Sequence, residues 1–206
     1  MDTSASRDKP VQQPRRIPDD VYAEWVKPNM IVVCSDALII RGNGNLLLGV
    51  REIEPVKGLP WIIGGRVQKG MALDLAVQQQ VLKETGLQVA VVGQSGVYRR
   101  VYRQGEDRDD LVFTYVVVET GGELKQDFQH SKFVEIGGYG KDFDSLHSRV
   151  KQPILESSIF ESRGGISVAQ LLRKRVEAGA GDLQTYYTTV RDMRRSTPSH
   201  DDVTPL

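Results

Sequence analysis

A helix that carries a carboxylate on its apolar side is the feature that most constrains how this sequence folds. The segment 72–85 has helical periodicity, and Gly86 directly after it is a residue that commonly ends helices. On a wheel of about 3.6 residues per turn, its apolar side chains form one stripe, and Glu84 falls on the same stripe. Burial of an ionised carboxylate is unfavourable unless a cation or several donors compensate it. Periodicity alone therefore leaves two interpretations of Glu84, a ligand-binding carboxylate or a side chain that bends out to solvent.

A glycine-rich turn comes shortly before this helix. Gly64 and Gly65 follow the apolar run Trp61-Ile62-Ile63. Because glycine has no side chain, it lets backbone carbonyls and amides approach a ligand closely. A helix with such an approach and one inward carboxylate is typical of a site for a hard, oxygen-seeking cation. The turn thus favours the ligand-binding interpretation of Glu84.

The remaining pattern mixes strands and helices. We expect a short helix that starts at Asp19 or Asp20 and is stopped by Pro28, a strand over 30–41, a turn at 42–45 and a strand over 46–50. Further strands are expected at 89–102, 111–119 and 133–136, with a charged loop over 104–110. Helical segments are expected at 143–162, 166–178 and 181–194. This order, with an early hairpin, predicts a mixed α/β (α+β) domain.

Composition and charge exclude several classes of function. Lys plus Arg and Asp plus Glu both number 27, so no net positive charge attracts the chain to nucleic acid. The apolar stretches are too short to span a membrane, and the N-terminus lacks the apolar segment of a secretory signal. We therefore expect a cytoplasmic protein with no nucleic-acid or membrane partner. Cys34 is the single cysteine, which excludes an intramolecular disulfide.

The segment from Gly65 to Leu87, GRVQKGMALDLAVQQQVLKETGL, resembles a Nudix box, G-x5-E-x7-R-E-U-x-E-E-x-G-U. The box is eroded, because four of its Glu and Arg positions hold Met71, Gln79, Gln80 and Lys83. A pyrophosphatase that uses several metal ions needs those carboxylates. The resemblance implies the Nudix fold, a mixed sheet sandwiched between helices. The missing carboxylates indicate that the chain is poorly suited to ordinary Nudix chemistry.

A longer segment is similar to one branch of that family, the GDP-mannose mannosyl hydrolases. It is LLLGVREIEPVKGLPWIIGGRVQKG, residues 46–70, and the likeness resumes at Phe113-Thr114-Tyr115 and at Gln129-His130. It implies hydrolysis of GDP-mannose or GDP-glucose to GDP and free sugar with one Mg²⁺, or Mn²⁺, in a homodimer. We expect a flexible leader over 1–17, a Nudix domain over 18–163, a helical extension over 164–194 and a disordered tail over 195–206.

The resemblance assigns the metal site and the base. Three groups would hold the ion: the carbonyl of Gly64, the carboxylate of Glu84 and the amide of Gln129. His130, next to that amide, would act as general base, which suits an imidazole because its unperturbed pKa lies near neutrality. Attack by water at the anomeric carbon expels an intact nucleoside diphosphate. A single divalent ion and arginines suffice to stabilise that leaving group.

The resemblance also assigns the substrate contacts. Arg51 and Arg66 would bind the diphosphate through planar, bidentate donors and assist its departure. Asp36 would hold a sugar hydroxyl, and Tyr115 would contact a phosphate. Arg100 stands where the family has a histidine on the sugar side, which predicts an altered sugar preference. Plain alternatives exist for these residues, namely surface ion pairs for the two diphosphate-binding arginines and core packing for the tyrosine.

Two other functions remain open at this point. One is cleavage of a different phosphoanhydride, against which the loss of box carboxylates argues. The other is binding of a nucleotide sugar without turnover, since Lys83 adjoins Glu84 and would neutralise it in place of a metal. The helices over 166–194, with basic residues and an apolar stripe, would then serve as a partner surface. The arginines around 99–108 alternate with aspartates, which favours a solvated hairpin over a nucleic-acid site.

Overall fold

A computed structural model describes residues 17–26, 29–54, 56–102, 108–126, 130–163, 165–179 and 181–195. Most of the predicted leader, the tail from residue 196 onward, and the predicted metal ligand Gln129 lie outside these described residues. The predicted stop of the first helix at Pro28 does so too.

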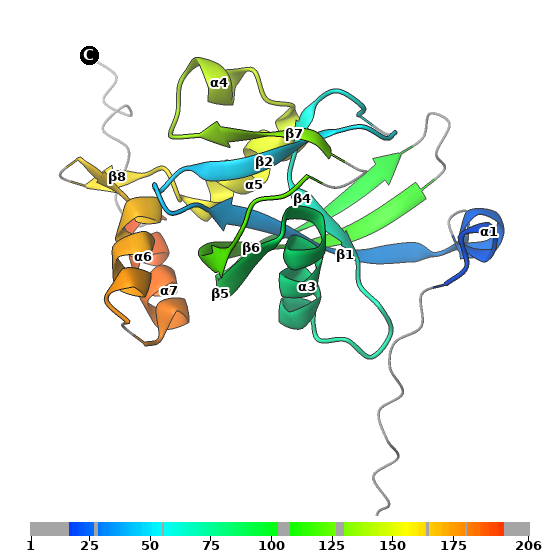
Figure 1. Cartoon of the computed structure of the whole chain (residues 1–206), viewed down its shortest axis with the longest axis horizontal. Helices are drawn as coiled ribbons and strands as arrows, with labels where there is room; N and C mark the ends of the chain where they lie inside the picture. The colour runs from blue at the N-terminus through cyan, green and yellow to red at the C-terminus, as the bar shows by residue number, and fades with distance from the viewer. Residues whose placement is uncertain are drawn as a thin grey trace, which may run out of the picture.

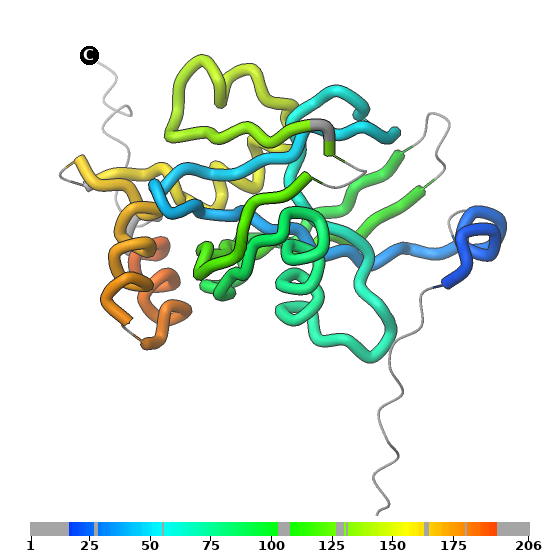
Figure 2. Tube along the Cα trace, viewed as in Figure 1, coloured from blue at the N-terminus to red at the C-terminus, as the bar shows by residue number. Residues whose placement is uncertain are grey.

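One mixed sheet organises the described part of the chain (Figures 1 and 2). Its strands are β1 (Ile31–Ile40), β2 (Leu46–Arg51), β3 (Pro60–Trp61), β4 (Ile63–Arg66), β5 (Leu87–Tyr102), β6 (Arg108–Gly122) and β7 (His130–Ile136). The order is β3-β2-β1-β6-β5, while β4 pairs with β1 and β7 with β2. Strands β1 and β6 run parallel, and the other pairs are antiparallel.

Helices cover both faces of this sheet, as predicted. Along β1 the side chains alternate, so that Ala37 and Ile39 pack towards α3 (Leu73–Thr85) and Leu38 and Ile40 pack on the other side. The second face is covered by α5 (Ser148–Ser157), α6 (Val168–Glu177) and α7 (Leu183–Arg195). The mixed α/β architecture is therefore confirmed. In the part of the chain that the structure describes, no helix is both long and apolar enough to cross a membrane.

Smaller elements complete the fold. They are α1 (Asp19–Val21), the π-helical turn η1 (Tyr22–Val26), α4 (Lys141–Asp144), β8 (Ser162–Arg163) and β9 (Ile166–Ser167). Pro18 precedes α1 and no side chain caps that helix, so the expected aspartate cap is wrong. The β8–β9 hairpin was not predicted, because each of its strands has only two residues.

Helix α3 ends where the sequence predicts. Gly86 takes a left-handed conformation with φ of 75°, and its amide donates to the carbonyl of Leu82. A side chain on Gly86 would lie 2.4 Å from the carbonyl oxygen of Glu123, so only glycine fits both the conformation and the space. The helix buries Val77, Val81 and also Glu84, which is only 2% exposed. The solvent-facing interpretation of Glu84 is therefore wrong.

Three positions of the predicted charged loop belong to a strand instead. Arg108, Asp109 and Asp110 begin β6, where Arg108 pairs across the sheet with Tyr102, whereas the sequence predicted a loop there. Ion pairs of Arg108 with Asp110 and of Arg99 with Asp109 stabilise this charged extension of the hairpin.

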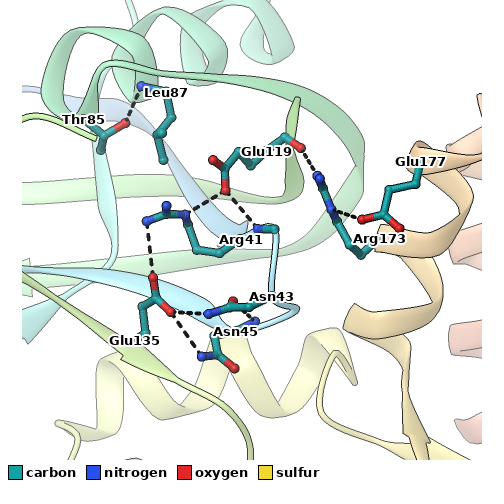
Figure 3. Close-up of polar contacts among 10 residues, drawn as sticks. Arg41, Asn43, Asn45, Thr85, Leu87, Glu119, Glu135, Arg173 and Glu177 are labelled. Atoms are coloured by element: carbon teal, nitrogen blue, oxygen red, sulfur yellow. Dashed lines mark hydrogen bonds and ion pairs between the residues drawn. The ribbon is translucent and has the colours of Figure 1, made fainter. Parts of the chain in front are cut away.

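The C-terminal helices pack against the sheet. From the predicted apolar stripe, Val168 and Leu172 are fully buried in the core. Figure 3 shows the polar contacts near the β1–β2 turn, among them the contact from Arg173 that joins α6 to the sheet. Arg41 lies 2.7 Å from Glu119 and 3.3 Å from Glu135, and Arg173 of α6 donates to the backbone carbonyl of Glu119. Val168 and Leu172 of the predicted apolar stripe therefore face the core of the protein, and a partner surface on these helices stays a prediction.

Candidate functional site

A pocket lies at the end of the sheet where β1, β4, β5 and β6 meet. It brings together four residues that the sequence nominated as site residues. They are Asp36, Arg51, Gly64 and Arg100. Trp61, Gly65, Tyr102, Arg108 and Asp110 also line it. Residues that are far apart in the sequence therefore form one polar pocket with an aromatic wall.

A buried ion pair forms the floor of the pocket. Arg100 Nη1 donates to Asp36 Oδ2 at 2.7 Å, and each residue is only 5% exposed. Burial raises the pKa of Asp36, and the positive charge of Arg100 opposes that shift. The guanidinium of Arg100 also lies 5.7 Å from the ring centre of Trp61. These contacts fix the orientation of both charged groups in the pocket.

Gly64 and Gly65 separate this pocket from a second polar group. A side chain on Gly64 would lie 2.2 Å from Asp36 Oδ1, whereas one on Gly65 would lie 2.7 Å from Gln80 Nε2. Since successive residues of a strand face opposite sides of a sheet, the glycine pair touches the pocket on one side and helix α3 on the other. Gly64 has no room for a larger residue, because an added side chain would also meet backbone atoms of Ser35 and Asp36, whereas at Gly65 it would meet only the end of the Gln80 side chain.

The second polar group is Glu84 with His130. The Nε2 atom of His130 lies 4.0 Å from Glu84 Oε2, and the side chains are 4% and 2% exposed. Gln80 donates a hydrogen bond to the other carboxylate oxygen. Lys83 is exposed while its neighbour Glu84 is buried, so the proposed neutralisation of Glu84 by Lys83 is wrong. His130 belongs to β7 and is buried, so it does not lie in a solvated loop.

Arg51 links the two groups electrostatically. Burial lowers its pKa, and the negative charges of Glu84 and Asp36 act in the opposite direction. In the sheet, Arg51 pairs with His130 across β2 and β7, at a bulge in the register. The Nη2 atom of Arg51 donates to the backbone carbonyl of Glu54 at 3.4 Å.

The oxygen donors fit a single hard cation. Among the described residues, no group of three or more His, Cys, Asp or Glu side chains forms a metal site. One carboxylate, Glu84, and the carbonyls of the adjacent glycine turn remain, which suits Mg²⁺ because this ion keeps several waters or phosphate oxygens.

Two predicted residues stand apart from the pocket. Arg66 is exposed, and its guanidinium carbon lies 3.8 Å from the ring centre of Tyr22. Tyr115 packs in the apolar cluster between the sheet and α3, and burial raises its pKa. Asp36 pairs with Thr114, so the next residue, Tyr115, faces the opposite side of the sheet. Their phosphate-binding roles stay predictions, and the placement of Tyr115 agrees with core packing.

Comparison with known proteins places the chain in a family. No protein-family model matches it. It is similar to the low-salt glycan biosynthesis protein Agl8 of Haloferax volcanii, with 30% identity over 150 residues, 70% of this chain and 91% of that protein. This chain belongs to the family of Agl8.

Solved structures identify the fold of this Agl8-family chain. A Nudix hydrolase from Nitrosomonas europaea superposes with a TM-score of 0.52 at 19% identity, over 61% of this chain and 87% of that one. A MutT Nudix hydrolase from Burkholderia pseudomallei gives 0.53 at 18% identity, over 62% and 98%. The predicted Nudix fold is therefore confirmed.

Sequence reasoning missed part of the pocket of this Agl8-family chain. Arg108 and Asp110, interpreted from the sequence as a solvated hairpin, line the pocket and pair at 2.7 Å. Arg108 also lies 4.7 Å from the ring centre of Tyr102. The sequence signal that could have predicted the burial of Asp110 is a period of two along the strand. Asp110 shares its side of the strand with the buried Val112 and Thr114.

Proposed function

We propose that this protein hydrolyses a nucleoside diphosphate sugar, with GDP-mannose or GDP-glucose as the expected substrate, by attack of water at the anomeric carbon. The observation that carries the proposal is the two-part site. A single buried carboxylate, Glu84, lies beside a buried histidine, and a pocket with the Asp36–Arg100 pair lies across the glycine turn. The first part suits a diphosphate with its metal ion, and the second suits a sugar.

The leaving group needs stabilisation of negative charge. Glu84 and the carbonyl of Gly64 would hold one Mg²⁺, with the amide of Gln129 as a further ligand. When bound, the ion neutralises charge that develops on the diphosphate. Arg51, whose charge interacts with both Glu84 and Asp36, would bind the phosphate oxygens directly. A phosphoanhydride hydrolase with several ions would need more carboxylates than the described residues offer.

The nucleophile needs a base. His130 would take a proton from water as the new carbon–oxygen bond forms and the bond to the diphosphate oxygen breaks. The products are a free sugar, GDP and the protonated imidazole. Asp36, held by Arg100, would orient the sugar through a hydroxyl. Since the displacement occurs in one step, the sugar is released with inverted configuration.

The relative supports the substrate class. The name of Agl8 assigns that protein to low-salt glycan biosynthesis. A nucleotide-sugar substrate for this chain agrees with that name.

Isotope labelling tests the proposal directly. The protein is incubated with GDP-mannose or GDP-glucose and Mg²⁺ in water enriched in oxygen-18, and the products are separated by chromatography. Labelled free sugar with unlabelled GDP is expected. Label in GMP or in a sugar phosphate would show attack at phosphorus instead. Absence of GDP above the protein-free background would reject hydrolysis at the anomeric carbon.

One observation favours binding without turnover as a second candidate. Gln80 donates a hydrogen bond to Glu84, so an amide already compensates part of the charge that a metal would neutralise. Calorimetric titration with GDP-mannose, with and without Mg²⁺, separates the two functions. Tight, metal-independent binding without product would support the second candidate, whereas metal-dependent binding with product would reject it.

A further inference from the structure

Two buried polar atoms of the pocket lack a partner. Arg100 Nη2 is a donor and Asp110 Oδ1 is an acceptor, and neither makes a hydrogen bond within the described part of the chain. Their residues are 5% and 3% exposed. Buried polar groups in folded proteins are almost always hydrogen-bonded, because an unsatisfied one destabilises the fold. A pair of such atoms in one pocket indicates a ligand that supplies the missing bonds.

The fold places these two residues side by side. Arg100 and Asp110 are direct cross-strand partners in β5 and β6, and both line the pocket. Side chains at opposed positions on one face of an antiparallel pair have Cβ atoms roughly 4.5–5.5 Å apart. The two unpartnered atoms therefore belong to neighbouring side chains that line one pocket.

In each of the two side chains, a second polar atom is already hydrogen-bonded and holds the side chain in place. Arg100 Nη1 is bonded to Asp36 at 2.7 Å, and Asp110 Oδ2 accepts from Arg108 at 2.7 Å. The remaining donor and acceptor are consequently held in place before any ligand arrives. Such preorganisation reduces the entropy that binding would otherwise cost.

The chemistry of the pair selects the ligand. A hydroxyl group donates and accepts at the same oxygen, so it satisfies a guanidinium N–H and a carboxylate oxygen together. A phosphate only accepts, and the carboxylates of Asp36 and Asp110 would repel it from this end of the pocket. The pair therefore suits a neutral, hydroxyl-bearing group.

We propose that Arg100 and Asp110 form a hydroxyl-binding subsite for the sugar ring, and that Asp110 determines specificity for a sugar that carries this hydroxyl. The inference rests on the proposed function for the identity of the ligand. Beyond the proposed function, it assigns a sugar contact to Asp110 and explains how the site would discriminate between sugars. An analogue that lacks the hydroxyl leaves both buried atoms unpaired, which disfavours its binding strongly.

The first part of the test varies the ligand and leaves the residues of the subsite unchanged. Binding is measured by calorimetry in the His130→Gln variant with Mg²⁺, so that the ligand is not consumed. The ligands are GDP, GDP-mannose and GDP-mannose analogues that each lack one ring or exocyclic hydroxyl. One deoxy analogue should bind about 10–100-fold more weakly than GDP-mannose. Equal affinity for all deoxy analogues, or for GDP-mannose and GDP, would overturn the inference.

The second part of the test varies the protein, by substitution of one of two neighbouring aspartates. Asp110→Ala should weaken GDP-mannose binding by about 10-fold or more and abolish the preference over the deoxy analogue, while GDP affinity stays unchanged. Asp109→Ala is the control, because Asp109 also pairs with an arginine, Arg99, but does not line the pocket. Unchanged discrimination in the Asp110→Ala variant would overturn the inference.

The two proposals fail separately. Calorimetry reports on the subsite even if no sugar is ever released, whereas product analysis of the unmodified protein reports on hydrolysis. Loss of hydroxyl discrimination at Asp110 without any turnover would support the subsite and reject the hydrolase. Turnover with unaltered discrimination in the Asp110→Ala variant would support the hydrolase and reject the subsite.

Discussion

The imidazole of His130 lies against the Cα atom of Gly49 in the neighbouring strand, so that a methyl group on Gly49 would come within 2.2 Å of His130 Cδ2. We expect Gly49→Ala to displace the ring and to lower turnover at least about 10-fold, with a loss of roughly 1–3 kcal/mol in unfolding free energy. Steady-state kinetics and urea unfolding measure the two effects. Gly138→Ala is the matched control, because its added methyl meets no described atom within 4 Å.

The base role of His130 has its own signature in the kinetics. His130→Gln should reduce kcat by about 100-fold or more, because general base catalysis typically contributes that much. Affinity for the nucleotide sugar, measured by calorimetry, should stay nearly the same. An equal loss in kcat and in affinity would contradict a base role and indicate a binding or structural role for the ring.

The dependence of activity on Mg²⁺ concentration tests whether Glu84 is a metal ligand. Glu84→Gln keeps the size of the side chain but removes its charge, so the concentration of Mg²⁺ needed for half-maximal activity should rise about 10-fold or more. Glu123→Gln serves as the control, since Glu123 is exposed and pairs with the exposed Lys125 at 3.3 Å. Unchanged magnesium activation in the Glu84 variant would remove this residue from the metal site.

Much of the fold follows from local patterns in the sequence. The strand ending at Ile40, the hairpin turn and helix α3 with its terminal Gly86 were predictable, because alternation, turn residues and a C-terminal glycine act within a few positions. The charged start of β6 was not, since its strand conformation depends on partners in β5. Pairing of Arg108 with Asp110 and of Arg99 with Asp109 overrides the low strand propensity of those residues.

The candidate site was predictable only in part, for a similar reason. Periodicity placed Glu84 on the buried side of α3, and the resemblance assigned roles to Asp36 and Arg100 that agree with their shared pocket. Their mutual ion pair could not be read from the sequence, because it joins strands that lie 64 positions apart. The position of Asp110 opposite Arg100 likewise depends on the register of β5 and β6.

The Arg41 contacts predict a stability effect far from the site. Arg41 holds Glu119 and Glu135, whose side chains are 17% and 31% exposed. Arg41→Ala should cost about 2–3 kcal/mol of unfolding free energy, below the range for fully buried pairs because of this partial exposure. Arg99→Ala, at a site where the arginine side chain is 63% exposed, should cost less than about 1 kcal/mol. Equal losses in chemical unfolding would show that Arg41 does not stabilise the turn.

Tyr187 of α7 tests whether the C-terminal helices belong to the same folding unit as the sheet. Its ring is 1% exposed and packs against Gly93 of β5, and its hydroxyl donates to the carbonyl of Ser157 at 3.0 Å. Tyr187→Ala should destabilise the whole protein by about 3–5 kcal/mol, because it leaves a cavity between α7 and the sheet. Tyr187→Phe keeps the ring and should lose only about 1 kcal/mol, the usual worth of one hydrogen bond. Circular dichroism and tryptophan fluorescence should report one shifted transition in the alanine variant. A separate early transition confined to helix content would instead show that the extension unfolds independently of the sheet.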